Sequence, residues 1–481
     1  MLIYSVERKK KKVFWELMKQ NQPGRYVFVT FLLALSFAGC NAPKSSLKKF
    51  DGYFASADYA ASVEFAQSKL SKGNKTKRED LLWTLQLGAV ERLRRNYETS
   101  VNYFDKAEEL LNRYDTHSKA LDTIGSTVVN ENIVPYLGEE YDGIMVNTYK
   151  ALNFMTLKKD DLARVEFNRA LDRQRRAKEK FAKEIVKLDQ EIQEQEQGKD
   201  GARMKQNIEN PEIDAIVAEK YPNLNAFEAY PDFVNPFTTY IAGVYFNLVG
   251  DHAKAVDLLK ESYGMVRDNR YVAEDLAVTE KVLDGQQTLE NTVWVIFENG
   301  LGPTKKEIRL DLPLFLVTRE VKYVGIALPK LEFRAQAFHS LWIKAGRANY
   351  QTLPVADMDR VVQTEFKKDF KGILTRAIIS ATIKAAAQYA MENQNSSGGS
   401  LSSVFMAVYS FATTAADVRI WTTLPKDFQV ARFGIPQDRL IQIHPSGGTP
   451  FNVKIPDCNN AIVYVRIPFA QSVPIYDLIT Y

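Results

Sequence analysis

Residues 81–110 read LLWTLQLGAVERLRRNYETSVNYFDKAEEL, and this stretch decides the fold of the first half of the chain. Gly88 lies in a first predicted helix and Tyr97 at a turn. A second predicted helix carries a small residue, an aromatic residue four positions on and a small residue three further on, namely Ser100, Phe104 and Ala107. Small residues let two helices approach closely, and the aromatic ring fills the space left on the neighbouring pair. The stretch therefore predicts a helical hairpin.

The same order of small and large residues recurs in segments 236–262 and 144–170 and in a degenerate form at 59–68. The residues that carry it are Gly243, Ala255, Leu259 and Ser262, then Ala151, Phe154, Ala163, Phe167 and Ala170, then Tyr59, Ala61, Phe65 and Ser68. This pattern resembles the tetratricopeptide repeat, and the resemblance covers residues 45–285. Such pairs cannot bury their apolar faces alone, so neighbouring pairs stack. The alternative is a non-repetitive helical bundle with chance spacing.

Two segments interrupt the predicted repeat domain of residues 40–286. Residues 173–197 are highly charged but have one apolar seam, which predicts an inserted amphipathic helix; the seam is Ala177, Phe181, Ile185, Leu188 and Ile192. This helix would dock a partner or rest on its own repeats. Residues 198–230 lose the period and gain Gly, Asn and Pro, which predicts a long loop. Near its end, Tyr230 and Phe233 would line the concave face of the repeats and contact a partner.

The second half changes to a period of two. Residues 292–297 (TVWVIF) are typical of a buried strand, and residues 451–455 and 461–467 alternate around a turn at 456–460. These patterns predict an antiparallel, β-sandwich-like domain with hairpins over residues 287–481. The predicted fold class is therefore α+β, with an all-α array of tetratricopeptide-like repeats followed by a β-sandwich-like domain.

An apolar helical hairpin is inserted into this second domain at residues 360–416. Its first helix ends at the breaker NQNSSGGS, residues 393–400, and a second apolar helix follows. Arg376 and Lys384 make the first helix a poor membrane span. The apolar part, residues 372–416, would be buried between the repeats and the sheet, contact lipid, or pack against a partner, and the sequence leaves these alternatives open.

The N-terminal region has the features of a lipoprotein signal peptide. Residues 26–39 form an uncharged apolar run, too short to span a membrane comfortably, with basic residues before it and Ala-Gly-Cys at its end. This end resembles the lipobox of bacterial lipoproteins, in which Cys40 is acylated and becomes the first residue of the mature chain. Asn41, in place of Asp, implies the outer membrane by the same resemblance. Several acyl chains on one cysteine anchor a protein stably.

We therefore expect residues 1–39 to be removed, with Met18 as an alternative start. The other possibilities are an ordinary secreted signal peptide and a membrane anchor. The leader also explains the basic character of the chain, because it holds seven of the 63 Lys and Arg and two of the 59 Asp and Glu. The remainder has 56 basic and 57 acidic residues, so its charge gives no support for nucleic-acid binding.

The sequence contains no motif of a known enzyme or metal site. Its four histidines lie apart, and HExxH, CxxC, P-loop and Gly-x-Ser-x-Gly sequences are missing. Asp357 and Asp359 could act as acid and base, or one of them could cap the helix beginning near residue 360. Asp417, Arg419 and Trp421 alternate and would share a strand face, either as a binding patch or with Asp417 and Arg419 as a structural charged pair. Cys458 is expected to be a small apolar residue in a strand turn, and two cysteines exclude a disulfide scaffold.

A run of motifs in the second half carries a family resemblance. They are Trp294–Pro303 (WVIFENGLGP), Lys305–Ile308 (KKEI), Ala327–Lys330 (ALPK), Ala356–Asp359 (ADMD), Ala416–Pro425 (ADVRIWTTLP) and Gln429–Arg432 (QVAR). In this order they resemble an uncharacterised family of bacterial outer-membrane lipoproteins with tetratricopeptide repeats. Members are often encoded beside small lipoproteins that activate penicillin-binding proteins. The resemblance implies a role at the cell envelope and supplies no catalytic residues.

We expect a non-enzymatic, lipid-anchored scaffold or adaptor on the periplasmic side of the outer membrane, without cofactor or metal. It would bind envelope proteins or peptides through its helical repeats, in peptidoglycan synthesis or envelope assembly. The expected contact residues are Tyr97, Tyr230, Phe233, Arg419 and Trp421. The alternatives are a structural component of a secretion or polysaccharide-export machine, and a hydrolase that uses Asp357 and Asp359.

Overall fold

The computed structural model describes residues 42–72, 77–121, 135–197, 201–225, 230, 234–317, 320–394 and 415–481. The chain divides into two units, residues 1–47 and residues 48–481. Only the start of the first helix belongs to the first unit among the described residues. The signal peptide, Cys40, Phe233 and most of the second helix predicted for the inserted hairpin lie outside the described residues.

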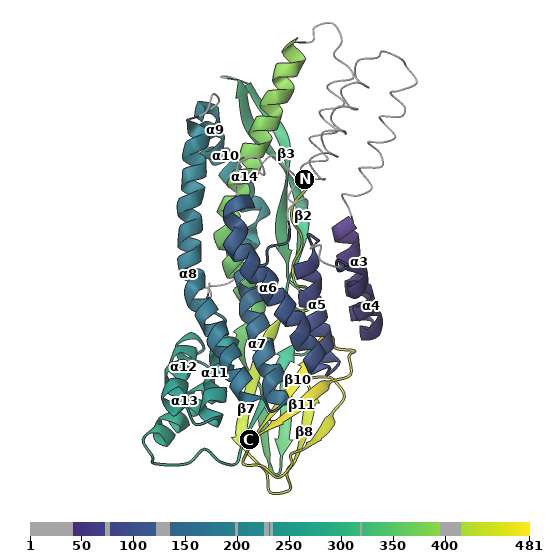
Figure 1. The fold of residues 1–481 in the computed structure, drawn as a ribbon, viewed down its shortest axis with the longest axis vertical. Helices are drawn as coiled ribbons and strands as arrows, with labels where there is room; N and C mark the ends of the chain where they lie inside the picture. The colour runs from purple at the N-terminus through teal and green to yellow at the C-terminus, as the bar shows by residue number, and fades with distance from the viewer. Residues whose placement is uncertain are drawn as a thin grey trace. The chain divides into compact units, whose positions relative to one another are not determined.

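The structure is mixed α and β, with helices mostly in the first half and sheets in the second, as predicted (Figure 1). The described helices of the first half are α3 (Ala42–Ala55), α4 (Tyr59–Lys69), α5 (Asp80–Leu93), α6 (Tyr97–Leu121), α7 (Glu140–Thr156), α8 (Asp160–Glu196), α9 (Gly201–Ile208), α10 (Pro211–Lys220), the 3-10 helix η3 (Pro222–Asn225), α11 (Pro236–Leu248), α12 (His252–Met265) and α13 (Arg270–Leu283). The second half contributes α14 (Met358–Gln394).

The strands form three sheets, with the orders β11-β10-β1-β7-β6, β5-β4-β8-β9 and β2-β3. They are β1 (Thr292–Asn299), β2 (Thr304–Val317), β3 (Glu320–Glu332), β4 (Leu341–Ala345), β5 (Ala348–Gln351), β6 (Leu353–Asp357), β7 (Asp427–Gly434), β8 (Leu440–Pro445), β9 (Phe451–Lys454), β10 (Asn460–Ile467) and β11 (Ile475–Thr480). Every residue of β1 and β10 is buried, which confirms the strand predicted from TVWVIF.

Two details of the predicted β domain are wrong. β1 and β10 are parallel, so the sheet is mixed rather than antiparallel. β9 pairs with β8 in the four-stranded sheet, so the turn at 456–460 connects two sheets instead of closing a hairpin. A period of two fixes which face of a strand is buried, but it does not encode the neighbouring strand.

Four helix–turn–helix units in the first half share one turn geometry. In α3–α4, α5–α6, α7–α8 and α11–α12, a residue with positive φ lies two positions before the second helix; these residues are Ala57, Arg95, Lys158 and Gly250. The amide of that residue donates to the carbonyl three positions back, and the next amide donates to the carbonyl five positions back. Both bonds satisfy carbonyls at the end of the first helix, as in the Schellman motif.

The shared turn brings equivalent positions of the two helices into contact. A Cβ on Gly88 would lie 2.5 Å from the ring of Phe104, and a Cβ on Gly243 would lie 3.0 Å from Leu259. Gly88 thus allows a helix approach that a larger residue would prevent, as the small-and-large pattern predicts. In the α3–α4 pair the predicted register is wrong by one residue. Ser62 and Ala66 are fully buried, in place of the predicted Ala61 and Phe65.

Three of the first helices, α5, α7 and α11, pack against the second half of the chain. α5, α7 and α11 are buried along nearly their whole length. Phe237 of α11 stacks on Phe428 of β7 with ring centroids 3.7 Å apart. Trp421 lies against Phe104 and Tyr149, with ring centroids 5.8 and 6.0 Å away. The inner face of the helical units is therefore covered by the second half of the same chain.

The two predicted interruptions of the repeats take another form. Segment 173–197 continues α8 and is not a separate helix. The predicted loop 198–230 contains α9, α10 and η3, so that prediction is wrong for residues 201–225. Asn210 caps α10 with its side chain and Pro211 occupies the first helical position. Asn and Pro, which suggested a loop, here begin a helix.

The first helix of the inserted hairpin, α14, packs along the β2–β3 ribbon with α9, α10 and the end of α8; we call this group the arm (Figure 1). Asn207 of α9 donates to Thr382 of α14 at 3.1 Å, and Arg376 of α14 pairs with Glu191 of α8 at 3.3 Å. Residues 415–418, the described part of the predicted second helix, are not helical. Within the described ranges, no helix has the length and hydropathy needed to cross a membrane.

Candidate functional site

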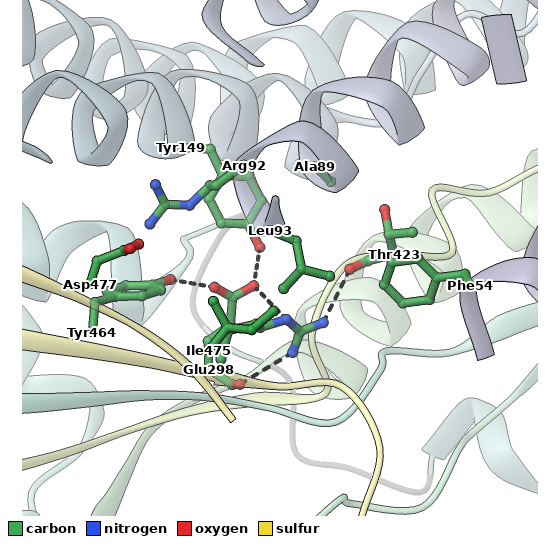
Figure 2. A pocket seen from close by; sticks show the side chains of 11 residues that line it. Phe54, Ala89, Arg92, Leu93, Tyr149, Glu298, Thr423, Tyr464, Ile475 and Asp477 are labelled. Carbon is green, nitrogen blue, oxygen red and sulfur yellow. Dashed lines mark hydrogen bonds and ion pairs between the residues drawn. The ribbon is translucent and has the colours of Figure 1, made fainter. Parts of the chain in front are cut away.

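A small polar cavity lies where α5 and α7 meet β1 and β10 (Figure 2). Its volume is about 30 Å³, which leaves room for about one water molecule. Its ionisable side chains include Arg92 from α5, Tyr149 from α7, Glu298 from β1, and Tyr464 and Arg466 from β10. Each of these five is less than one-tenth exposed, so the site is internal.

Glu298 is the centre of this cluster. Its carboxylate accepts hydrogen bonds from the hydroxyls of Tyr149 at 2.7 Å and Tyr464 at 2.6 Å, and it pairs with the Arg466 guanidinium at 3.3 Å. Burial, and then the charge of Glu298, raises the pKa of both tyrosines well above its ordinary value. The hydroxyls therefore remain protonated donors, and both oxygens of the buried carboxylate have partners.

Arg92 and Tyr97 extend the network toward the end of the chain. The Arg92 guanidinium lies 4.9 Å from the ring centroid of Tyr464 and donates to Asn153 at 2.6 Å. Tyr97, the first residue of α6, donates its hydroxyl to Asp477 of β11. Burial, and then Asp477, raises the pKa of Tyr97. Tyr97 was predicted to contact a partner, but in this structure its hydroxyl binds the last strand of its own chain.

This network holds α5 and α7 against the sheet. Its cavity is too small for a substrate, and its charges come from elements that only the fold brings together. Removal of one partner from a buried ion pair leaves an uncompensated charge, which costs several kcal/mol. We therefore expect the two halves of the chain to unfold together.

The predicted carboxylate pair lies where β6 meets α14. Asp357 ends β6 and accepts from the amide of Arg360 at 3.3 Å, so the capping alternative is confirmed. Asp359 is fully buried and pairs with Lys426. Burial raises the pKa of Asp359 to about 6, against the opposing effect of Lys426. Both carboxylates thus have structural contacts within the chain.

Three further residues predicted to contact a partner lie in the interior. Arg419 is 3% exposed and pairs with Asp417 at 2.6 Å, while Trp421 is 1% exposed. Tyr230 is 6% exposed and lies under the Arg360 guanidinium, 3.9 Å from its ring centroid. Contact with a partner is incompatible with this burial, so these assignments are corrected. Aromatic and arginine side chains in this pattern fill a core as readily as they form a binding patch.

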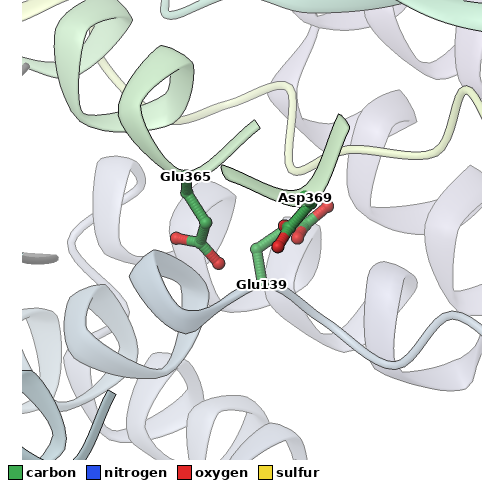
Figure 3. Close-up of side chains that lie close together, drawn as sticks. All are labelled: Glu139, Glu365 and Asp369. Atoms are coloured by element: carbon green, nitrogen blue, oxygen red, sulfur yellow. The ribbon is translucent and has the colours of Figure 1, made fainter. Parts of the chain in front are cut away.

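Three carboxylates that the sequence did not single out lie together near the N-terminal ends of α7 and α14 (Figure 3). Glu139 directly precedes α7, and Glu365 and Asp369 follow one another by one turn on α14. One oxygen of each lies within 4.8 Å of the others. The spacing of Glu365 and Asp369 marks a shared helix face. No local sequence pattern connects these two residues with Glu139, which is more than 200 positions away in the chain.

No protein-family model matches the chain, and neither does any curated protein or solved structure.

Proposed function

We propose that the chain is a non-enzymatic, lipid-anchored adaptor on the periplasmic side of the outer membrane, with Cys40 as the anchored residue. In this proposal the four helix–turn–helix units are tetratricopeptide-like repeats that bind envelope proteins, and the second half is β-sandwich-like. The common turn and the small-to-large contacts between paired helices support the repeats. The lipobox and the motifs of the second half support the location and a part in peptidoglycan synthesis or envelope assembly.

The outer surface of α8 is the surface that we assign to the partner. Because the second half of the chain covers the inner faces of α5, α7 and α11, we assign the partner to the outside of the helical units. α8 carries two pairs of large apolar side chains that are between 42% and 58% exposed, namely Leu162 and Val165, and Ile185 and Val186. Apolar side chains grouped on an otherwise charged helix are typical of an interaction surface. This observation carries the proposal.

The two alternatives have less support. A hydrolase needs an acid and a base within reach of its substrate, whereas Asp357 caps a helix and Asp359 is buried against Lys426. An export-machine component would form a large, symmetric assembly in detergent extracts. The adaptor would be recovered with a specific partner instead.

Photo-crosslinking in cells tests the proposal. A photoreactive amino acid replaces Val165 or Val186 in the full-length chain, and Leu283 of α13, which is 46% exposed, provides the matched control position. We expect the same envelope protein to be crosslinked from both positions on α8 and not from position 283. Crosslinks only from position 283, or none from α8, would contradict the proposal. Membrane fractionation of Cys40→Ala tests the anchor separately.

A further inference from the structure

One side of the four-stranded sheet carries an exposed tryptophan. Along β4 and β8, buried apolar residues alternate with more exposed ones. Ile343 of β4 and Ile443 of β8 are buried, whereas Trp342 is 48% exposed. Tyr350 of β5, which pairs with Ile343, stacks on Phe433 of β7 with ring centroids 4.5 Å apart. The isoleucine side of the sheet therefore faces the protein interior, and the Trp342 side faces solvent.

The strand register places polar side chains around Trp342. Trp342 lies opposite Gln351 of β5 and His444 of β8, and Lys344, two positions along β4, lies opposite Gln442 of β8. Residues directly opposite each other in an antiparallel pair point to the same side of the sheet. Neighbouring strands are about 4.8 Å apart, and alternate residues of one strand about 6.8 Å apart. These five side chains therefore form one continuous surface on the solvent side.

Trp342 differs from the other tryptophans of the described ranges. Trp83, Trp294 and Trp421 are fully buried, and each donates its indole N–H to a side chain of the protein, at 3.1, 3.0 and 2.8 Å. The indole N–H of Trp342 has no such acceptor among the described residues, and no aromatic ring or cation of those residues stacks on it. A large aromatic ring that is held on a strand and keeps a free donor is typical of a recognition surface.

The side chains around Trp342 suit a carbohydrate. The C–H groups on one side of a pyranose ring form an apolar surface that stacks on an indole, and the hydroxyls at the ring edge need hydrogen-bond partners. A Gln or Asn amide offers both donors and acceptors to such hydroxyls. Gln442 lies opposite Asn452 of β9, and Gln351 lies beside Trp342, where donation to Ser340 at 2.9 Å orients its amide. Three amides thus accompany the exposed ring.

Charge complementarity favours an acidic carbohydrate. β4, β5, β8 and β9 contain no Asp or Glu, whereas Lys344 and Lys454 are both exposed on the solvent side. Such a surface attracts carboxylates. A protein partner is less suited, because interface centres are apolar and poor in Lys, and the large apolar side chains on this side of the sheet are Trp342 and Leu440. Single-stranded nucleic acid is bound by successive aromatic rings along a strongly basic groove, and this surface has one tryptophan.

We propose that the solvent side of the four-stranded sheet binds an acidic polysaccharide. One sugar stacks on Trp342, its neighbours bond through their hydroxyls to Gln442 and Asn452, and a sugar carboxylate pairs with Lys344. This function goes beyond the proposed adaptor function. It uses another surface than α8, so either proposal can fail while the other stands.

Titration calorimetry of the full-length chain tests the surface with two probes of equal length, an oligogalacturonate and a neutral cello-oligosaccharide. We expect the oligogalacturonate to bind more tightly, and its affinity to fall as the salt concentration rises. Trp342→Ala should lower this affinity at least about tenfold, because the stacking contact is lost. Lys344→Gln should lower it about threefold, as for an exposed ion pair, without changing the affinity for the neutral probe.

A second exposed aromatic residue provides the control. Tyr323→Ala replaces a ring of β3 that is 66% exposed and lies outside the four-stranded sheet, and it should bind the oligogalacturonate as the wild type does. Melting temperatures show whether each variant is folded. If Trp342→Ala does not fold, Asn452→Ala is the second variant, with an expected loss of about threefold for one hydrogen bond.

Four results would overturn the proposal. They are no binding of the oligogalacturonate at millimolar concentration, equal binding of the two oligosaccharides, tighter binding of polyuridylate than of the oligogalacturonate, and unchanged affinity of a folded Trp342→Ala. Loss of affinity in Trp342→Ala but not in Tyr323→Ala would support it.

Discussion

Two acidic sites connect α7 to the second half of the chain: the buried carboxylate of Glu298, and the partly buried group of Glu139, Glu365 and Asp369. Their charges are offset in different ways. Glu298 meets the middle of α7, where two tyrosine hydroxyls and a guanidinium satisfy its oxygens. The carboxylates around Glu365 meet the start of α7, where the hydroxyl of Tyr141 has no partner in the described part of the chain. One helix thus combines a contact whose carboxylate oxygens both have partners with one in which burial raises the pKa of Glu365.

The largest effect is expected at the contact around Glu298. Glu298→Ala leaves the Arg466 guanidinium and two tyrosine hydroxyls buried without their shared acceptor. The free energy of unfolding should fall by about 3–5 kcal/mol. Urea denaturation of the full-length chain measures this change. A loss below about 1 kcal/mol would show that the cluster does not hold the two halves together.

A matched pair of substitutions compares the two groups directly. Tyr464→Phe removes a donor from a buried carboxylate and should cost about 1.5–3 kcal/mol of unfolding free energy. Tyr141→Phe removes a hydroxyl that has no hydrogen-bond partner among the described residues, so it should be neutral or slightly stabilising. Both substitutions delete one tyrosine hydroxyl, so the two losses in unfolding free energy can be compared directly from urea denaturation curves measured under the same condition. Equal losses would remove the contrast between the groups.

Glu365→Gln tests how the second group responds to pH. Burial, and then the neighbouring charges, raises the pKa of Glu365 in the native state well above its ordinary value of 4.5. Above about pH 5, the native state therefore keeps a proton that the unfolded state has released. Wild-type stability therefore falls as the pH rises through this window. Gln stays neutral, so the variant should gain relative to the wild type as the pH rises above about 5, by about 1.4 kcal/mol per unit by which the native pKa exceeds the unfolded one. A difference that is constant with pH would contradict this assignment.

The smallest effect is expected at an exposed turn between α3 and α4. Ala57 is exposed and has a φ of 58°, a conformation that glycine adopts without strain. Ala57→Gly should raise the free energy of unfolding by up to about 1 kcal/mol, reduced by the entropy that glycine adds to the unfolded chain. Thermal denaturation measures it. A clear loss would show that the common turn geometry is not maintained there.

The helical pairs could be predicted because their determinants are local. Gly88 and Phe104 are close in the sequence, and their spacing encodes the contact that the structure shows. The buried strand β1 was also evident from six consecutive residues. The partner of β1 was not, because β10 follows only after most of the second half, and parallel pairing leaves no local signal.

The sites were less predictable than the elements. Glu298 was visible only as part of a strand end, while its partners Tyr149 and Arg466 lie in other elements. For Trp421 the sequence left a binding patch and a structural role open, because alternating residues resemble a strand, and the structure places it in the core between the helices and the sheet. Periodicity identifies a buried face, but long-range packing decides which polar residues lie on it.

Hydrogen exchange of the intact chain, followed by mass spectrometry, tests most directly whether α5, α7 and the five-stranded sheet form one unit closed around Glu298. We predict that amides of α5, α7, β1 and β10 exchange at a common slow rate, and that Glu298→Ala accelerates all four together. Exchange of α5 and α7 that is orders of magnitude faster than that of β1 and β10 would contradict this. The inner face of the helical units would then open independently and become available to a partner.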